Sequence, residues 1–172
     1  MAEDAFISQV GYRALRFGMS KAEAENVLGD AISVTRPIDR REVDPEDMPI
    51  IKDVVECDYA PYRPYHDRGI GLTFHKDRLV KVFIDDSTEP LMFRGIDLFD
   101  RNRKKVMEAL FELDDELYGD REAGFWAKLG IVAAWPSFWK RYKIGYVEFV
   151  DSEFVLELLD YYFFDDLDAP LK

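Results

Sequence analysis

The sequence predicts an α+β protein built from two tandem repeats, each a short helix followed by a small antiparallel sheet. Three observations support this prediction: a capped helical segment near residue 20, two similar strand–turn–strand segments, and a second helical segment between those two. The chain has 172 residues, of which 48% are hydrophobic, so it is long and apolar enough to bury a core. We expect the repeats to span residues 1–90 and 91–172 and to pack as one compact unit.

The two predicted helices begin at residues that cap helices well. Ser20 is a favourable N-cap, and Glu23 completes a capping box, in which each side chain accepts a hydrogen bond from the other residue's backbone N–H. Gly29 can adopt the left-handed conformation that ends a helix. We expect Asp100 to cap the second helix. The apolar stripe of that helix consists of Val106, Ala109, Leu110 and Leu113.

Strands are expected where β-branched, aromatic and other apolar residues cluster. Three such segments are residues 31–35, 54–59 and 131–135. Alternation along the second segment places Val55, Cys57 and Tyr59 on one face. Two polar segments that contain prolines are predicted as loops, residues 36–53 and 60–67.

Two segments have the pattern of hairpins and resemble each other. The first consists of strands 70–74 and 79–84 around a polar turn, and the second of strands 144–149 and 154–159. Phe74 and Phe149 are separated by 75 residues, as are several later pairs of residues in the two segments. Chance similarity is the alternative, but the matching order of helices and hairpins favours an internal repeat.

The charge of the chain restricts its partners. It carries 23 basic and 35 acidic residues, a formal net charge of −12, which would repel a phosphate backbone and so argues against direct nucleic-acid binding. A basic protein partner would be attracted, although the acidity could also serve solubility alone. The single cysteine, the absence of a recognisable signal peptide and the absence of a long apolar run predict a cytoplasmic protein that does not bind membranes.

No motif for catalysis, cofactor binding or metal binding is recognisable. Cys57, His66 and His75 do not have the spacing of metal ligands, and phosphate-binding glycine loops are absent. Acidic runs occur at 85–86, 114–116 and 165–168, and we interpret them as solvated surface. The sequence therefore predicts a protein that is not an enzyme and that needs no metal or cofactor.

Two aromatic regions and the acidic tail are candidates for recognition. A loop with three tyrosines and two prolines loses little entropy on binding, and tryptophan is common at interfaces. The alternative is that these rings pack over the sheet or in the core. The candidate binding residues are Tyr59, Tyr62, Arg63, Tyr65, Trp126, Trp135, Trp139, Asp165, Asp166 and Asp168.

Residues 17–29, Phe-Gly-Met-Ser-Lys-Ala-Glu-Ala-Glu-Asn-Val-Leu-Gly, resemble the helix signature of BamE-like proteins and of β-lactamase-inhibitor proteins. The resemblance implies a tandem repeat of a helix and a small antiparallel sheet, and it transfers no functional residue. The chain differs from the first group in having no lipobox, and from the disulfide-bonded inhibitors in having one cysteine. In size and acidity it is also similar to bacterial toxin-immunity proteins.

These observations favour a protein-binding function: an inhibitor or immunity protein that occludes a basic partner such as a toxin. Carboxylates would accelerate the encounter, and aromatic residues would supply buried area. One alternative is an acidic protein that mimics DNA, which requires a spaced row of surface carboxylates. Another is a hydrolase that uses a carboxylate pair, which requires a pocket where the two carboxylates converge.

Overall fold

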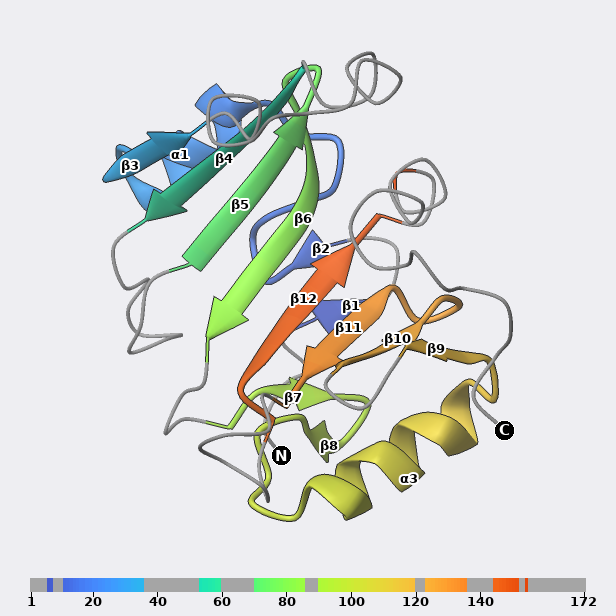
Figure 1. Cartoon of the computed structure of the whole chain (residues 1–172). Coiled ribbons are helices and arrows are strands. Elements are labelled where there is room, and N and C mark those ends of the chain that lie inside the picture. The colour runs from blue at the N-terminus through green and yellow to red at the C-terminus, as the bar shows by residue number, and fades with distance from the viewer. Residues whose placement is uncertain are drawn as a thin grey trace.

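The computed structural model describes residues 6–7, 11–35, 53–59, 70–85, 90–119, 123–135, 144–151 and 154. These residues form one eight-stranded antiparallel sheet, two helices and two small two-stranded sheets (Figure 1). The predicted α+β class is confirmed. Within the described part of the chain, no helix is long and apolar enough to cross a membrane.

The large sheet consists of two four-stranded meanders, each preceded by a helix. The first set is α1 (Lys21–Leu28), β3 (Ser33–Thr35), β4 (Val54–Tyr59), β5 (Ile70–His75) and β6 (Arg78–Asp85). The second set is α3 (Arg103–Leu113), β9 (Leu117–Gly119), β10 (Ala123–Trp126), β11 (Ile131–Ala134) and β12 (Tyr146–Val150). The strand order is β3-β4-β5-β6-β12-β11-β10-β9, so the last strands of the two meanders pair in the middle of the sheet.

Two short hairpins were not predicted from the sequence. They are β1 (Phe6–Ile7) with β2 (Gly11–Tyr12), and β7 (Met92–Phe93) with β8 (Ile96–Asp97). A side chain at Gly11 would place its Cβ 2.2 Å from the carbonyl oxygen of Leu15, so only glycine fits there. Strands of two residues leave almost no periodic pattern, which explains why sequence patterns missed them.

The predicted capping box of α1 is present. The Ser20 hydroxyl accepts a hydrogen bond from the Glu23 N–H at 3.2 Å, and the Glu23 carboxylate accepts one from the Ser20 N–H at 2.7 Å. These contacts lower the pKa of Glu23. The next backbone N–H, that of Lys21, donates to Asp77 in the β5–β6 turn at 3.1 Å, and the helix ends at Gly29, whose φ is 85°. Local capping and one long-range contact together fix this helix on the hairpin.

The predicted cap of the second helix is wrong by two residues. Asn102, rather than Asp100, is the N-cap of α3, and its side chain accepts a hydrogen bond from the Lys105 N–H at 3.3 Å. Asp100 instead accepts a hydrogen bond from the Asn102 N–H at 2.9 Å, which lowers the pKa of Asp100. Aspartate and asparagine are about equally good caps, so residue preference alone could not choose between these positions.

The first predicted hairpin is confirmed. Strands β5 and β6 are joined through Lys76 and Asp77, whose φ angles are 50° and 60°. Positive φ at both central residues is typical of the two-residue turns that match the twist of a hairpin.

The second predicted hairpin is wrong. Phe149 of β12 lies opposite Ile131 of β11 on one side and opposite Val82 of β6 on the other. A strand has only two edges, so none remains for residues 154–159 to pair with β12. Phe154 is helical, and residues 155–159 lie outside the described residues, as do most of the predicted loop residues 36–53 and all of 60–67.

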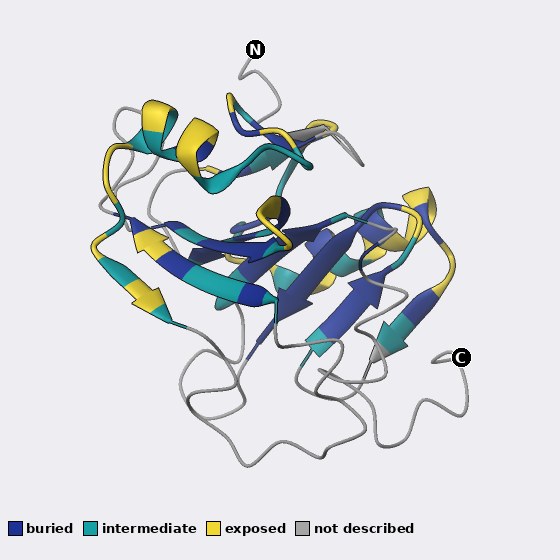
Figure 2. Cartoon of the chain, turned by 90° about the horizontal axis from the view of Figure 1, so that it is seen from above, coloured by how far each residue is buried: buried dark blue, intermediate teal, exposed yellow. Residues whose placement is uncertain are grey.

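One face of the sheet lies on the core, which is covered by α1, α3 and the two small hairpins. Tyr12 of β2 stacks on Phe149 of the central strand β12, with ring centroids 5.7 Å apart. Ala24 of α1 and Val106 and Leu110 of α3 belong to the same core. Figure 2 shows that buried residues dominate the central strands, whereas α1 and the edge strand β3 carry exposed ones.

Candidate binding site

The face of the sheet opposite the core carries a polar group of residues on β4, β5 and β6. Side chains alternate along a strand, so Glu56 and Asp58 point away from the side that holds Cys57 and Tyr59. The register places Thr73 opposite Glu56. We call this side of the sheet the second face.

A hollow of about 160 Å³ lies over this polar group. Strands β3, β4, β5 and β6 all contribute to its walls, so it depends on the register of the first meander. We call it the acidic hollow. Its lining residues are Thr35, Glu56, Cys57, Asp58, Gly71, Leu72, Thr73, Lys81 and Phe83.

The acidic hollow has an excess of negative charge. In the described part of the chain, the carboxylates of Glu56 and Asp58 form no ion pair and no hydrogen bond. Lys81 is the basic residue of the lining, and its ammonium group pairs with Glu148 of β12 at 3.1 Å. Because Glu148 compensates Lys81, no described residue is left as a counter-ion for the two carboxylates of β4.

Thr73 adds a hydroxyl to the acidic hollow. The residue is 4% exposed, and its hydroxyl forms no hydrogen bond with a described residue. This hydroxyl is not one of the buried polar atoms that lack a partner, so it carries no cost of that kind. It can accept a hydrogen bond from a ligand in the acidic hollow.

The remaining wall is aromatic. The ring of Phe83 lies 5.1 Å from that of Tyr146 on β12, at an interplanar angle of 38°. Gly71 lies beside it, and a Cβ at that position would be 3.2 Å from the Phe83 Cβ. Glycine at this position therefore lets the Phe83 side chain lie over the β5 backbone.

These groups can bind a cation. Carboxylates and hydroxyls accept hydrogen bonds from N–H donors, and an aromatic face attracts positive charge. An anion would meet two carboxylates without a counter-ion. Among the described residues, no group of three or more His, Cys, Asp and Glu side chains is placed to hold a metal ion.

The structure corrects the interpretation of Trp126 and Trp135 as binding residues. They are 0% and 6% exposed and belong to the core, which was the alternative interpretation. A Cβ on Gly124 would lie 2.8 Å from Leu117, 3.0 Å from Trp135 and 3.4 Å from Trp126, so this glycine makes room for both indole rings. Arg103 of α3 lies over the Trp135 ring, 5.3 Å from its centroid.

Tyr59 is likewise part of the core and is not exposed as a binding residue would be. Its exposure is 0%, and that of Cys57, on the same side of β4, is 1%. Burial raises the pKa of both the Cys57 thiol and the Tyr59 hydroxyl. The predicted binding residues that lie outside the described residues are Tyr62, Arg63, Tyr65, Trp139, Asp165, Asp166 and Asp168.

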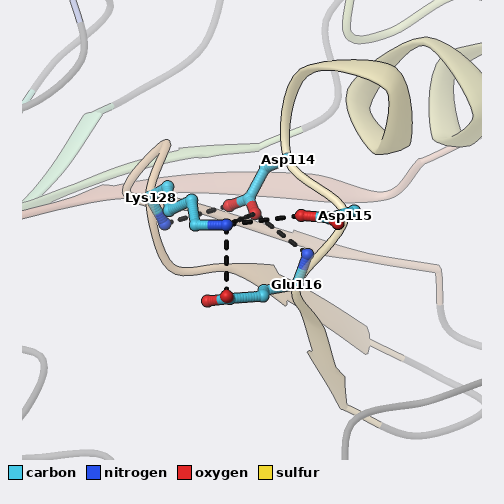
Figure 3. Close-up of polar contacts among 4 residues, drawn as sticks. All are labelled: Asp114, Asp115, Glu116 and Lys128. Carbon is cyan, nitrogen blue, oxygen red and sulfur yellow. Dashed lines mark hydrogen bonds and ion pairs between the residues drawn. The ribbon is translucent and has the colours of Figure 1, made fainter.

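The acidic run at 114–116 forms a structural ion-pair network with Lys128 (Figure 3). Asp114 is 2% exposed, and its carboxylate accepts hydrogen bonds from the backbone N–H groups of Glu116 and Lys128 at 3.0 and 2.9 Å. The Lys128 ammonium group lies 3.3 Å from Asp115 and 3.1 Å from Glu116. The network ties the end of α3 to the β10–β11 turn. The prediction of solvated carboxylates is confirmed for Asp115 and Glu116 and is wrong for Asp114.

Sequence patterns missed the residues of the acidic hollow, although one signal was present. The alternation that places Cys57 and Tyr59 on one side of β4 also places Glu56 and Asp58 on the other. The contribution of Thr73 depends on the pairing of β4, β5 and β6, which the sequence does not specify directly.

Comparison of the chain with known protein families, with curated proteins and with solved structures found no match. The acidic hollow and the charge of the chain therefore remain as the features that indicate a function.

Proposed function

We propose that this chain is a protein-binding protein that occludes a basic partner, in the manner of an inhibitor or immunity protein. The observation that carries the proposal is the acidic hollow, where Glu56 and Asp58 have no counter-ion among the described residues while Lys81 pairs with Glu148. Carboxylates left uncompensated on a shaped surface favour a ligand that brings positive charge.

The net charge of −12 supports the same proposal at long range. A field of one sign attracts a partner of opposite charge and raises the association rate, and added salt weakens this effect. Short-range contacts in the acidic hollow would then determine how long the complex lasts.

We also propose that the two helix–meander units are tandem repeats. The support is that α1 and α3 are each followed by four consecutive strands, and that β6 and β12 pair at the centre of the sheet. The spacing of 75 residues does not describe this correspondence, because it matches β5 with β12. The sheet order instead matches β6 with β12 as the last strand of each unit.

The function is tested by capture of partners from the source lysate with the tagged protein, at low and at high salt. We expect one basic protein at near-equal stoichiometry that is released at high salt. The matched variants are Asp58→Lys, in the acidic hollow, and Glu112→Lys, on α3; both residues are exposed, and both changes alter the net charge equally.

The Asp58→Lys variant should weaken capture by about tenfold or more, and Glu112→Lys should weaken it much less, only through the lower net charge. Equal loss in both variants would show that net charge alone governs capture, which contradicts a role for the acidic hollow. A captured partner that added DNA displaces from the wild-type protein would favour the DNA-mimic alternative instead.

A further inference from the structure

We propose that the acidic hollow is a socket for the guanidinium group of an arginine side chain on the partner. This inference deepens the proposed function, on which it rests, by naming the chemical group that is recognised. The size of the acidic hollow is the first argument. Its volume of about 160 Å³ is below the roughly 300–1,000 Å³ of small-molecule pockets, and it suits the end of one long side chain.

The order of residues across the strands is the second argument. Asp58 lies opposite Gly71, and Gly71 lies opposite Phe83. A carboxylate and an aromatic ring therefore flank a position that has no side chain. Neighbouring strands are about 4.8 Å apart, so the flanking residues are separated by about 10 Å at the backbone. The Phe83 ring leans over Gly71, with Cδ1 3.4 Å from where a Cβ of that residue would be. A planar cation can lie with its plane against this ring and one edge toward the Asp58 carboxylate.

The adjacent row supplies further acceptors. Glu56 lies opposite Thr73, and Thr73 lies opposite Lys81. A guanidinium group has five N–H donors and no acceptor, which complements the two carboxylates and the Thr73 hydroxyl. Glu148 lies opposite Phe83 and pairs diagonally with Lys81, so this lysine brings no uncompensated charge to the ligand.

Arginine fits this arrangement better than lysine does. Its group is planar, stacks on aromatic faces and donates in parallel to a carboxylate, whereas an ammonium group is a compact point charge that is more strongly hydrated. Citrulline has nearly the same shape as arginine and no charge. Comparison of the three side chains therefore separates charge, shape and planarity.

The test is an NMR titration of the full-length protein with the Nα-acetyl N-methylamides of arginine, lysine and citrulline. We expect the arginine compound to shift the backbone amide resonances of Gly71 and Thr73 in a saturable manner. The lysine compound should bind more weakly, and the citrulline compound should produce no saturable shift. Equal binding of lysine or citrulline would overturn the guanidinium assignment.

Matched variants locate the interaction. Replacing both carboxylates by amides, in Glu56→Gln with Asp58→Asn, should weaken binding of the arginine compound by at least about tenfold. The control Glu112→Gln should leave it unchanged. A double variant that is folded, as shown by its amide spectrum, and that still binds with wild-type affinity would overturn the proposal.

The outcomes distinguish this inference from the proposed function. Binding of the arginine compound at Gly71 without any captured basic protein would support the socket and count against an inhibitor role. Salt-sensitive capture of a basic protein that the double variant retains would support the protein-binding function and overturn the socket.

Discussion

The two halves of the sheet share one core face but differ on the second face. Over β4, β5 and β6 that face is polar and contains the acidic hollow. Over β10, β11 and the end of β12 it is apolar, with Phe125, Val132 and Val150 2%, 4% and 5% exposed in one cluster, while Glu148 of β12 pairs with Lys81. Antiparallel sheets commonly leave one face solvated, so the polar first half needs no cover on this face, whereas the apolar cluster of the second half is buried.

The difference is visible along single strands. All residues of β11 are buried, whereas in β4 the buried Cys57 and Tyr59 alternate with the partly or fully exposed Glu56 and Asp58. Uniform burial is typical of strands that are covered on both sides, and alternation is typical of strands covered on one side. The proposed recognition site lies in the first half of the sheet, and the uniformly buried strand β11 lies in the second.

The largest expected effect comes from the shared core. Trp126→Ala removes a fully buried indole and should lower the free energy of unfolding by about 3–5 kcal/mol. Phe83→Ala, on the second face, should cost about 1 kcal/mol because this ring is only half-buried. Urea denaturation followed by circular dichroism measures both. Similar losses in the two variants would show that the second face of the first half is also core.

Reciprocal substitutions on the second face should have smaller and unequal effects. Val132→Thr places a hydroxyl in an apolar environment and should cost about 1–3 kcal/mol. Thr73→Val removes a hydroxyl that lines the acidic hollow and forms no hydrogen bond with a described residue, so it should change stability by less than about 1 kcal/mol. Thermal unfolding of both variants tests this contrast. A marked destabilisation by Thr73→Val would mean that the hydroxyl is needed for folding rather than for a ligand.

The helix caps provide the next comparison between the halves. Ser20→Ala breaks a reciprocal capping box and should cost about 1 kcal/mol. Asn102→Ala should cost no more than this, since its side chain accepts a single hydrogen bond at 3.3 Å. Chemical denaturation can resolve the two values. A larger loss for Asn102→Ala would reverse the assignment of the stronger cap to the first half.

The smallest effect is a dependence of stability on alkaline pH in the first half. Burial raises the pKa of Cys57 and Tyr59 above their ordinary values of 9.0 and 10.0, so the unfolded chain loses these protons before the folded chain does. Stability should be unaffected by these groups below about pH 8.5 and should fall as the pH rises through the unfolded-state values.

Tyr59→Phe is the matched variant for this dependence. It removes one of the two groups, so the loss of stability between neutral pH and pH 11 should be smaller than in the wild-type protein. Denaturation midpoints measured across this range test the prediction. Identical pH profiles would show that burial of Tyr59 is not linked to its protonation.

Local features of the fold could be predicted from the sequence, and non-local ones could not. The Ser20–Glu23 capping box and the bounds of β4 at residues 54–59 depend on neighbouring residues and are confirmed. The prediction of the second hairpin was wrong because β12 pairs with β11 and β6. The composition of a strand does not determine which strands it pairs with.

The candidate site was predictable only in part, for the same reason. Tryptophan is common both in cores and at interfaces, so its sequence position alone does not predict its burial. Trp126 and Trp135 are buried because Gly124 leaves space for their rings. Glu56 and Asp58 could be placed on the second face by alternation. Their meeting with Thr73, Gly71 and Phe83 follows from the register of three strands, which only the structure supplies.

The most direct test of the central claim is the kinetics of partner binding by the wild-type protein, Asp58→Lys and Glu112→Lys, measured at two salt concentrations. We predict that both variants associate more slowly at low salt, because both reduce the net negative charge. Only Asp58→Lys should also dissociate faster, since only Asp58 lies in the acidic hollow. Equal dissociation rates for the two variants would contradict the assignment of recognition to the first half of the sheet.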